Sequence, residues 1–180
     1  MNMKLEQQQV EAARQGDIKA FGTLYGQYYA TMVWLAYSIL LDRHLAEDVA
    51  QQTFVKACEN IASLRQTDRF GAWLSRICRN TAIQEDRQRR RLAAYQRQQT
   101  DSPESTEDDS LPQAIRAAIA TLPPMYREIV VLHYYDQQSY ERIESMLGIT
   151  GHCVRGRLFR ARKRIEAYLK QRGRLKDQSA

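Results

Sequence analysis

The sequence predicts an all-α protein: two small helical domains joined by a flexible acidic linker, with a helix–turn–helix in the second domain. Three observations support this prediction. Apolar residues recur with a helical period through most of the 180 residues. Glycine is scarce, at eight residues, and no alternating runs rich in Val, Ile and Thr stand out. One segment between the helical regions is acidic and poor in apolar side chains.

Three helices are expected in the first domain, residues 1–97. Asp17 has the side chain of an N-cap, and the helix after it carries one apolar stripe. A second helix is expected over about 45–61. A loop over 63–68 then leads to a third helix over about 69–91. The apolar stripe of the first of these helices consists of Ile18, Phe21, Tyr25, Tyr28, Met32, Leu35 and Ile39.

The composition changes at residues 98–112. This segment holds five Asp or Glu residues and neither Lys nor Arg. A segment with one sign of charge and few apolar groups cannot bury enough surface to fold alone. We therefore expect a flexible acidic linker here, with Ser110 able to cap the helix that follows.

The second domain is expected over residues 113–180. Its first helix is predicted over 113–121, and Pro123-Pro124 ends it because the residue before a proline disfavours helical backbone. The next helix is predicted over about 125–135.

A helix–turn–helix follows. Ser139 can cap its first helix, and Gly148 can adopt the left-handed backbone that ends that helix. A second helix begins within a few residues and extends to about Leu169. Two short helices joined by a glycine turn form the unit whose second helix enters the major groove of DNA.

The last helix is strongly basic. Residues 151–180 hold ten Lys or Arg against two acidic residues, a local charge of +8. Such a surface binds phosphates with an affinity that falls as salt rises, while base choice comes from the N-terminal half of the helix. A solvated charged face is the alternative interpretation. The candidate DNA-reading residues are His152, Arg155, Arg157, Phe159, Arg160 and Arg162.

A second basic cluster lies in the first domain. Residues 65–97 hold nine Arg against three acidic residues, a local charge of +6, with Phe70 and Trp73 among them. Arg76, Arg79, Asn80 and Arg87 recur at helical offsets, which predicts a shared helix face. Cations interleaved with aromatic rings suit a single strand whose bases are unstacked. The alternatives are that Trp73 is a core residue and that the arginine run is a solvated helix end.

A polar face on the second helix is formed by Glu47, Asp48, Gln51 and Gln52. It is either a protein-docking surface or simply a solvated face.

Several classes of function are disfavoured. The three cysteines form no C-x-x-C pair, the histidines have no metal-ligand spacing, and we expect neither a metal nor a cofactor. Cys58 and Cys78 lie on apolar stripes and are expected to be buried.

No phosphate-cradling glycine loop or nucleophile pair is visible, so we do not expect an enzyme. The sequence has no signal-peptide pattern and no apolar run long enough to span a bilayer, which favours a cytoplasmic protein without membrane insertion.

Three stretches resemble the extracytoplasmic-function (ECF) group of sigma factors, within the sigma-70 family. They are residues 48–57, which begin Asp-Val-Ala-Gln-Gln, residues 70–80, which begin Phe-Gly-Ala-Trp-Leu, and residues 139–143, 147–149 and 154–162 of the helix–turn–helix. Their order and spacing around an acidic linker make the resemblance specific. It extends over about 17–91 and 113–169. The family commonly has a small polar residue where Gly156 stands, and Gly151-His152-Cys153 also differ from its usual pattern.

The resemblance implies a sigma factor that directs RNA polymerase to promoters and initiates transcription. The first domain would be sigma-2-like and bind the clamp helices of core RNA polymerase through Glu47, Asp48, Gln51 and Gln52. The second would be sigma-4-like, read the −35 element through the basic helix and dock on the polymerase flap. An anti-sigma factor is the implied regulator. The residues implied to recognise and melt the −10 element are Ser63, Arg65, Asp68, Trp73, Arg76, Arg79, Asn80 and Arg87.

A stand-alone helix–turn–helix regulator of transcription is the alternative. Such regulators usually dimerise on palindromic sites one helical turn apart, and the sequence shows no dimerisation heptad.

Overall fold

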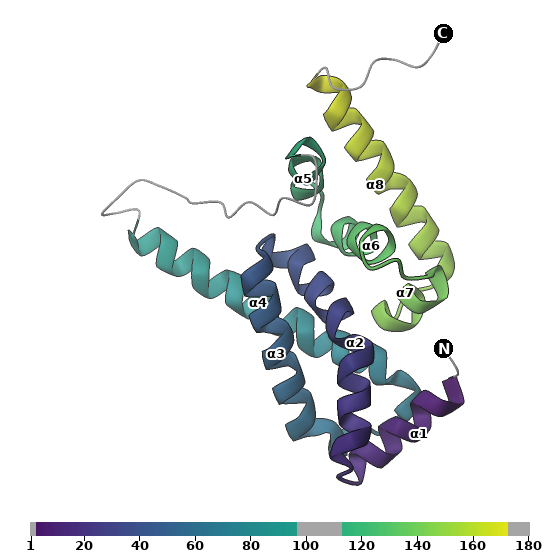
Figure 1. Cartoon of the computed structure of the whole chain (residues 1–180). Coiled ribbons are helices and arrows are strands. Elements are labelled where there is room, and N and C mark those ends of the chain that lie inside the picture. The colour runs from purple at the N-terminus through teal and green to yellow at the C-terminus, as the bar shows by residue number, and fades with distance from the viewer. Residues whose placement is uncertain (1–2, 97–112, 173–180) are drawn as a thin grey trace.

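The computed structural model describes residues 3–96 and 113–172, and all regular structure in these two ranges is helical (Figure 1), so the predicted all-α fold is confirmed. The predicted linker and Ser110 lie outside the described residues. The first unit comprises α1 (Met3–Arg14), α2 (Ile18–Leu40), α3 (Arg43–Asn60), the 3-10 turns η1 (Ile61–Ser63) and η2 (Thr67–Arg69), and α4 (Phe70–Gln96). The second unit comprises α5 (Gln113–Ala120), α6 (Pro124–Tyr134), α7 (Tyr140–Leu147) and α8 (Gly151–Gln171).

Local capping explains where the predicted helices begin and end. The Asp17 side chain accepts hydrogen bonds from the backbone N–H groups of Lys19 and Ala20 at 2.8 and 3.1 Å. In the helix–turn–helix, Ser139 caps α7 by accepting from the Arg142 N–H. Gly148 ends α7 with a φ of 64°, the left-handed conformation that glycine adopts without steric cost. These predictions from the sequence are confirmed.

The core of the first unit lies between α2, α3 and α4. α2 packs against both other helices. The fully buried side chains of this core include Tyr28 and Leu35 from α2 and Phe70 and Leu74 from α4. The apolar stripe predicted for α2 is therefore confirmed in part: Tyr25 is 38% exposed, and Ile18 is wrong as a core residue. It is 85% exposed because it is the first residue of α2 and extends beyond the packed part of the helix.

Helix α1 was not predicted from the sequence. It packs against α2 and also contacts η1 and η2, so it lies beside the segment that joins α3 to α4. Val10 and Ala13 are its buried apolar residues.

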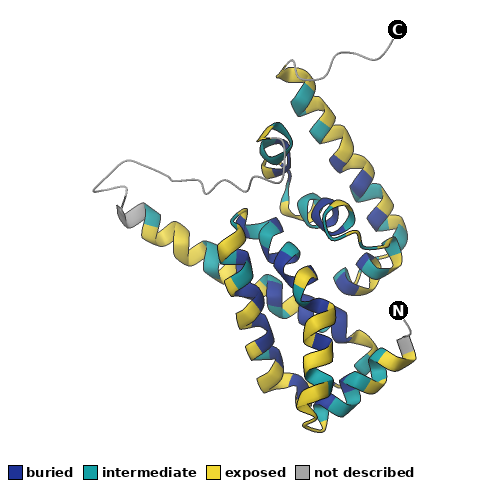
Figure 2. Cartoon of the chain, in the orientation of Figure 1, coloured by how far each residue is buried: buried dark blue, intermediate teal, exposed yellow. Residues whose placement is uncertain are grey.

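The core of the second unit is formed where α6 and α7 pack on α8. Ile129, Leu132, Ile143, Val154 and Leu158 are all buried there. The outer side of α8 and the second half of α4 are mostly exposed (Figure 2). The helix–turn–helix is thus held by its apolar stripe, and the opposite side of α8 faces solvent.

The two units pack against each other. α6 lies on α2 and α7 lies on α4 (Figure 1). Arg127 of α6 donates to the backbone oxygen of Ser38 in α2 at 3.0 Å, and it also bonds the carbonyls of Ala120 and Leu122 in its own unit. Buried side chains of both units belong to one continuous hydrophobic cluster.

Candidate nucleic-acid interface

A hollow lies where the turns η1 and η2 meet the first part of α4. It brings together four residues predicted to contact nucleic acid: Ser63, Arg65, Trp73 and Arg76. Two of these side chains are cationic and one is a large aromatic ring. This combination can neutralise a phosphate and stack a base at the same place.

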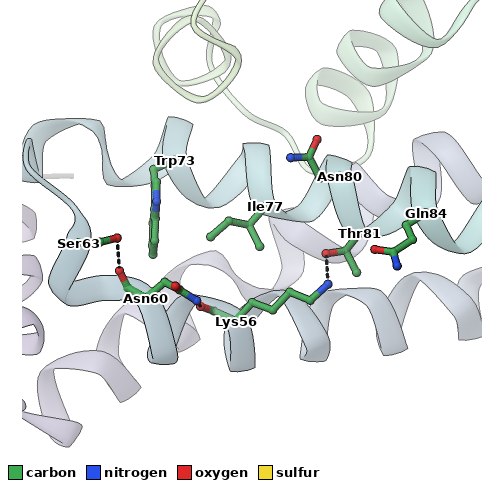
Figure 3. A pocket seen from close by; sticks show the side chains of 8 residues that line it. All are labelled: Lys56, Asn60, Ser63, Trp73, Ile77, Asn80, Thr81 and Gln84. Carbon is green, nitrogen blue, oxygen red and sulfur yellow. Dashed lines mark hydrogen bonds between the residues drawn. The ribbon is translucent and has the colours of Figure 1, made fainter.

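A second hollow lies between α3 and α4, and Figure 3 shows its lining side chains. Trp73 points from α4 towards α3, while the Lys56 Nζ donates to the Thr81 hydroxyl at 3.0 Å. Its volume of about 330 Å³ lies at the lower end of the range for small-molecule sites. Ser63 and Trp73 line this hollow and the first one. Trp73 is therefore half-buried and lines two open spaces.

A third hollow continues along α4. Asn80 lines both the second and the third hollow, and Arg87 and Arg91 line the third. The three hollows therefore follow the helix in a row. A single nucleic-acid strand needs this kind of elongated, cationic path.

Two predicted residues lie outside this row. Asp68 is exposed in η2 and lines none of the three hollows. Arg79 was predicted to share a face with Arg76, Asn80 and Arg87, but it is half-buried and faces the second unit instead. The reason is a long-range contact: Arg79 Nε lies 3.1 Å from the Glu128 carboxylate of α6.

Glu128 is a carboxylate in an unfavourable environment. Its side chain is 13% exposed, and burial raises its pKa above the ordinary value. The positive charges of Arg79 and Arg157 act in the opposite direction and offset only part of that rise. One carboxylate therefore interacts with two arginines that the sequence assigned to different DNA elements.

The exposed side of α8 carries the other set of predicted residues. Phe159 is 58% exposed, with the Lys163 ammonium 4.8 Å from its ring centre. Arg162 donates to the Tyr134 hydroxyl of α6 at 2.5 Å. His152, Arg155 and Arg160 are also exposed, whereas Arg157 is half-buried. The predicted face is thus accessible, except at Arg157.

The two unusual glycines of α8 make room for charged side chains. A Cβ at Gly156 would lie 3.2 Å from Arg160 Nη2, and the Arg160 Nε donates to the Gly156 carbonyl at 3.1 Å. A Cβ at Gly151 would lie 2.9 Å from Glu144 Oε2, so glycine lets this carboxylate of α7 approach the start of α8.

The polar face predicted on α3 is exposed at Asp48, Gln51 and Gln52. Glu47 is half-buried and pairs with Arg43 one turn earlier, at 3.1 Å. Cys58 is exposed close to this face, so the expectation that it is buried is wrong, whereas Cys78 is fully buried as predicted.

Sequence reasoning missed residues that complete the hollows, notably Lys56, Gln84 and Arg91. The helical offsets from Asn80 to Gln84 and from Arg87 to Arg91 could have identified two of them. Lys56 lies on another helix and gave no such signal.

Within residues 3–96 and 113–172, no three His, Cys, Asp or Glu side chains gather in a way that could hold a metal ion. No helix in the same described part of the chain is both long and apolar enough to cross a membrane.

Comparison with known proteins gives two family matches. Residues 24–92 match the family described as Sigma-70 region 2, and residues 112–165 match Sigma-70, region 4. The RNA polymerase sigma-H factor of Pseudomonas aeruginosa is 29% identical, with 94% of this chain and 96% of that protein covered. The ECF RNA polymerase sigma factor SigW of Bacillus subtilis is 30% identical, with coverages of 89% and 95%.

Two solved structures share the fold. One is CnrH in complex with the cytosolic domain of CnrY, at a TM-score of 0.65 and 25% identity, covering 92% of this chain and 97% of that one. The other is the sigma factor RpoE in complex with the anti-sigma factor NepR from Bartonella quintana, at a TM-score of 0.63 and 24% identity, covering 85% and 98%.

Proposed function

The chain belongs to the ECF group of the sigma-70 family and is an RNA polymerase sigma factor, and from this premise we propose how its two units divide the work on a promoter. The unit within residues 1–97 binds core polymerase and the −10 element, and the unit within 113–180 binds the −35 element. Residues 98–112 join them. Family membership favours this function over a stand-alone regulator.

The row of hollows along α4 is the observation that carries the −10 assignment. It combines Trp73, a ring accessible from two open spaces, with the cations Arg65, Arg76 and Arg87 on the same path. A melted strand offers unstacked bases and phosphates, so it matches a path on which one aromatic ring lies among several cations. Extruding a base costs a few kcal/mol, which the contacts in the hollows must offset.

The −35 assignment rests on the exposed face of α8. Arg155 and Arg160 can each reach a base edge as bidentate donors, and the exposed Phe159 can contact thymine methyl groups. The surrounding cations supply phosphate contacts that hold the helix in the groove.

The exposed face of α3 is the proposed docking surface for the clamp helices of core polymerase, with Asp48, Gln51 and Gln52 at its centre. The second unit would also contact the polymerase flap. We further propose an anti-sigma factor as regulator, a cytoplasmic location, and no catalysis by the chain itself, because the chemistry belongs to the polymerase.

Transcription from a promoter library, with core polymerase and the purified chain, tests this proposal. Asn80→Ala should relax base choice at the −10 element alone. Arg155→Ala should relax it at the −35 element alone, with a loss of about 1–3 kcal/mol in discrimination. Arg172→Ala, at the exposed C-cap residue that follows α8, is the matched control. If wild-type protein does not redirect the polymerase to new start sites, or if both variants keep wild-type preferences, the proposal is wrong.

A further inference from the structure

An acidic side chain of α7 reaches the start of α8, the helix proposed to read DNA. Glu144 is exposed, and its Oε2 lies 2.9 Å from the point where a side chain at Gly151 would begin. Arg155, one turn further along α8, brings its Nη1 to 3.6 Å from the same point. The carboxylate and the guanidinium therefore approach each other over the first turn of α8, in space that a glycine leaves open.

A second carboxylate of α7 lies on the same side as Glu144. Glu141 precedes Glu144 by three residues, which places both on one face of the helix. The pKa of Glu141 is lowered, first by hydrogen bonds from its own backbone N–H and from the Ser139 hydroxyl, and in addition by the positive charge of Arg155. The guanidinium of Arg155 therefore lies within electrostatic range of two negative charges on α7.

These carboxylates border a surface that otherwise attracts anions. Residues 151–180 carry a local charge of +8, and binding to DNA phosphates depends on such charge. A negative charge beside this surface lowers the affinity for every DNA sequence alike. A benefit that offsets this loss is control over how the neighbouring Arg155 is presented to the bases.

Arg155 needs a fixed orientation in order to select a base. A guanidinium recognises guanine through two parallel hydrogen bonds to O6 and N7, so its plane has to align with the base edge. Its five N–H donors allow one edge to face a carboxylate while another edge faces DNA. An arginine that is already oriented loses less conformational freedom on binding, whereas a freely rotating one also settles on the phosphates of any sequence.

We propose that Glu144 is a positioning residue for −35 recognition: its carboxylate, admitted by Gly151, orients the guanidinium of Arg155 towards one base of the element. Glu144 thereby raises base discrimination and lowers the affinity for DNA in general. An exposed pair of this kind contributes little to the stability of the fold, so its effect is on recognition. The inference rests on the proposed assignment of Arg155 to the −35 element.

Transcription by the reconstituted holoenzyme from a promoter library with a randomised −35 element is the test. Arg155→Ala first identifies the base position that Arg155 selects. Glu144→Ala should relax base choice at that position alone, by about three- to tenfold, the factor expected when one side chain loses its fixed rotamer. The two changes together should match Arg155→Ala at this position, because Glu144 acts through Arg155.

Gly151→Ala tests the same contact without changing any charge. The new Cβ would displace the carboxylate of Glu144, which is the end of a flexible side chain, so α8 can keep its backbone. This variant should relax base choice at the same position as Glu144→Ala does.

Glu166→Ala is the matched control. It removes the same charge from an exposed residue of α8 that lies beyond the proposed reading residues. Like Glu144→Ala, it should raise the affinity of the full chain for a duplex of unrelated sequence, because a negative charge near the DNA is lost. Base choice at the −35 element should stay at the wild-type level.

The orientation of Arg155 can also be measured without DNA. NMR relaxation of its Nε–H group in the full chain reports how strongly the side chain is ordered, and the signal is assigned by its loss in Arg155→Ala. The order parameter should fall in Glu144→Ala and in Gly151→Ala. It should keep the wild-type value in Glu166→Ala.

Unchanged base choice, or unchanged order of Arg155, in Glu144→Ala overturns the proposal. A further loss of discrimination when Glu144→Ala is added to Arg155→Ala also overturns it, since Glu144 would then contact a base itself, as a carboxylate does at cytosine. Failure of the proposed function looks different. In that case Arg155→Ala would leave the choice of −35 sequence unchanged, while the order parameter would still report whether Glu144 holds Arg155.

Discussion

At the scale of single residues, Gly71 shows how closely the first unit is packed. A Cβ at this position would lie 3.0 Å from the Tyr28 hydroxyl and 3.3 Å from its ring. Tyr28 cannot easily move, because its hydroxyl is bonded to Glu6 and its ring lies beneath Arg142. Gly71→Ala should therefore lower the free energy of unfolding by about 1–3 kcal/mol, measured by urea denaturation.

Gly22 provides the matched control for this prediction. It lies within α2, and a Cβ there would meet no atom within 4 Å. Gly22→Ala should raise the free energy of unfolding by about 0.5–1 kcal/mol, since alanine restricts the unfolded chain more than glycine does. A loss of stability in both variants would show that close packing on Tyr28 is not the cause.

Glu128 gives a prediction for how the free energy of unfolding depends on pH. Burial raises its pKa in the folded chain above the ordinary value of 4.5, against the opposing charges of Arg79 and Arg157. A carboxyl with a raised folded pKa stabilises the fold below its unfolded pKa, and this contribution is lost as pH rises through the folded pKa. The wild type should therefore lose stability relative to Glu128→Gln as pH increases above about 4.5.

Urea titrations of both proteins between about pH 4 and 7 measure this difference. The difference in free energy of unfolding should change steadily across that window and level off once Glu128 is ionised. A difference that stays constant with pH would mean that the folded and unfolded pKa values are equal.

At the scale of elements, α3 has one side that is buried in the core and one side that is exposed to solvent. Val49, Ala50 and Phe54 are buried against α2 and α4, while Asp48 and Gln51 face solvent. Changes on the exposed side should therefore leave the fold intact. Asp48→Ala with Gln51→Ala should weaken binding to core polymerase while helicity and melting temperature stay close to wild type.

Binding to core polymerase can be measured by fluorescence anisotropy. Lys19→Ala with Thr23→Ala, two exposed residues of α2, is the control pair and should bind normally. If the α3 double variant also binds normally, this face is only solvated. If its circular dichroism collapses, the two residues are structural.

The elements themselves could be predicted because their signals are local. The Asp17 cap, the Ser139 cap and the left-handed Gly148 all depend on neighbours within a few residues, and the helical period marks which side is buried. The two wrong burial predictions, for Ile18 and Cys58, concern contacts that are not local. The exposure of Ile18 and of Cys58 depends on which helices cover each end of α2 and α3, and spacing along one helix does not contain that information.

At the scale of the whole molecule, the candidate site could be predicted only in part. The row from Ser63 to Arg87 follows from spacing on one helix and its adjoining turn. The ion pair of Arg79 could not be predicted from that spacing, because its partner Glu128 is 49 positions away in another unit. The role of α1 was likewise hidden, since the Glu6–Arg142 pair joins residues 136 positions apart.

The shared core gives a prediction about cooperativity. Buried side chains of both units form one cluster, and Arg127 bonds to backbone oxygens on both sides of the interface. Units that share a core should unfold together, so calorimetry of the wild type should show a single transition whose calorimetric and van't Hoff enthalpies agree. Arg142→Glu should split it into two, because each unit then unfolds by itself. The variant with reversed charges at Glu6 and Arg142 should restore one transition. A single unchanged transition in Arg142→Glu would mean that this pair does not couple the units.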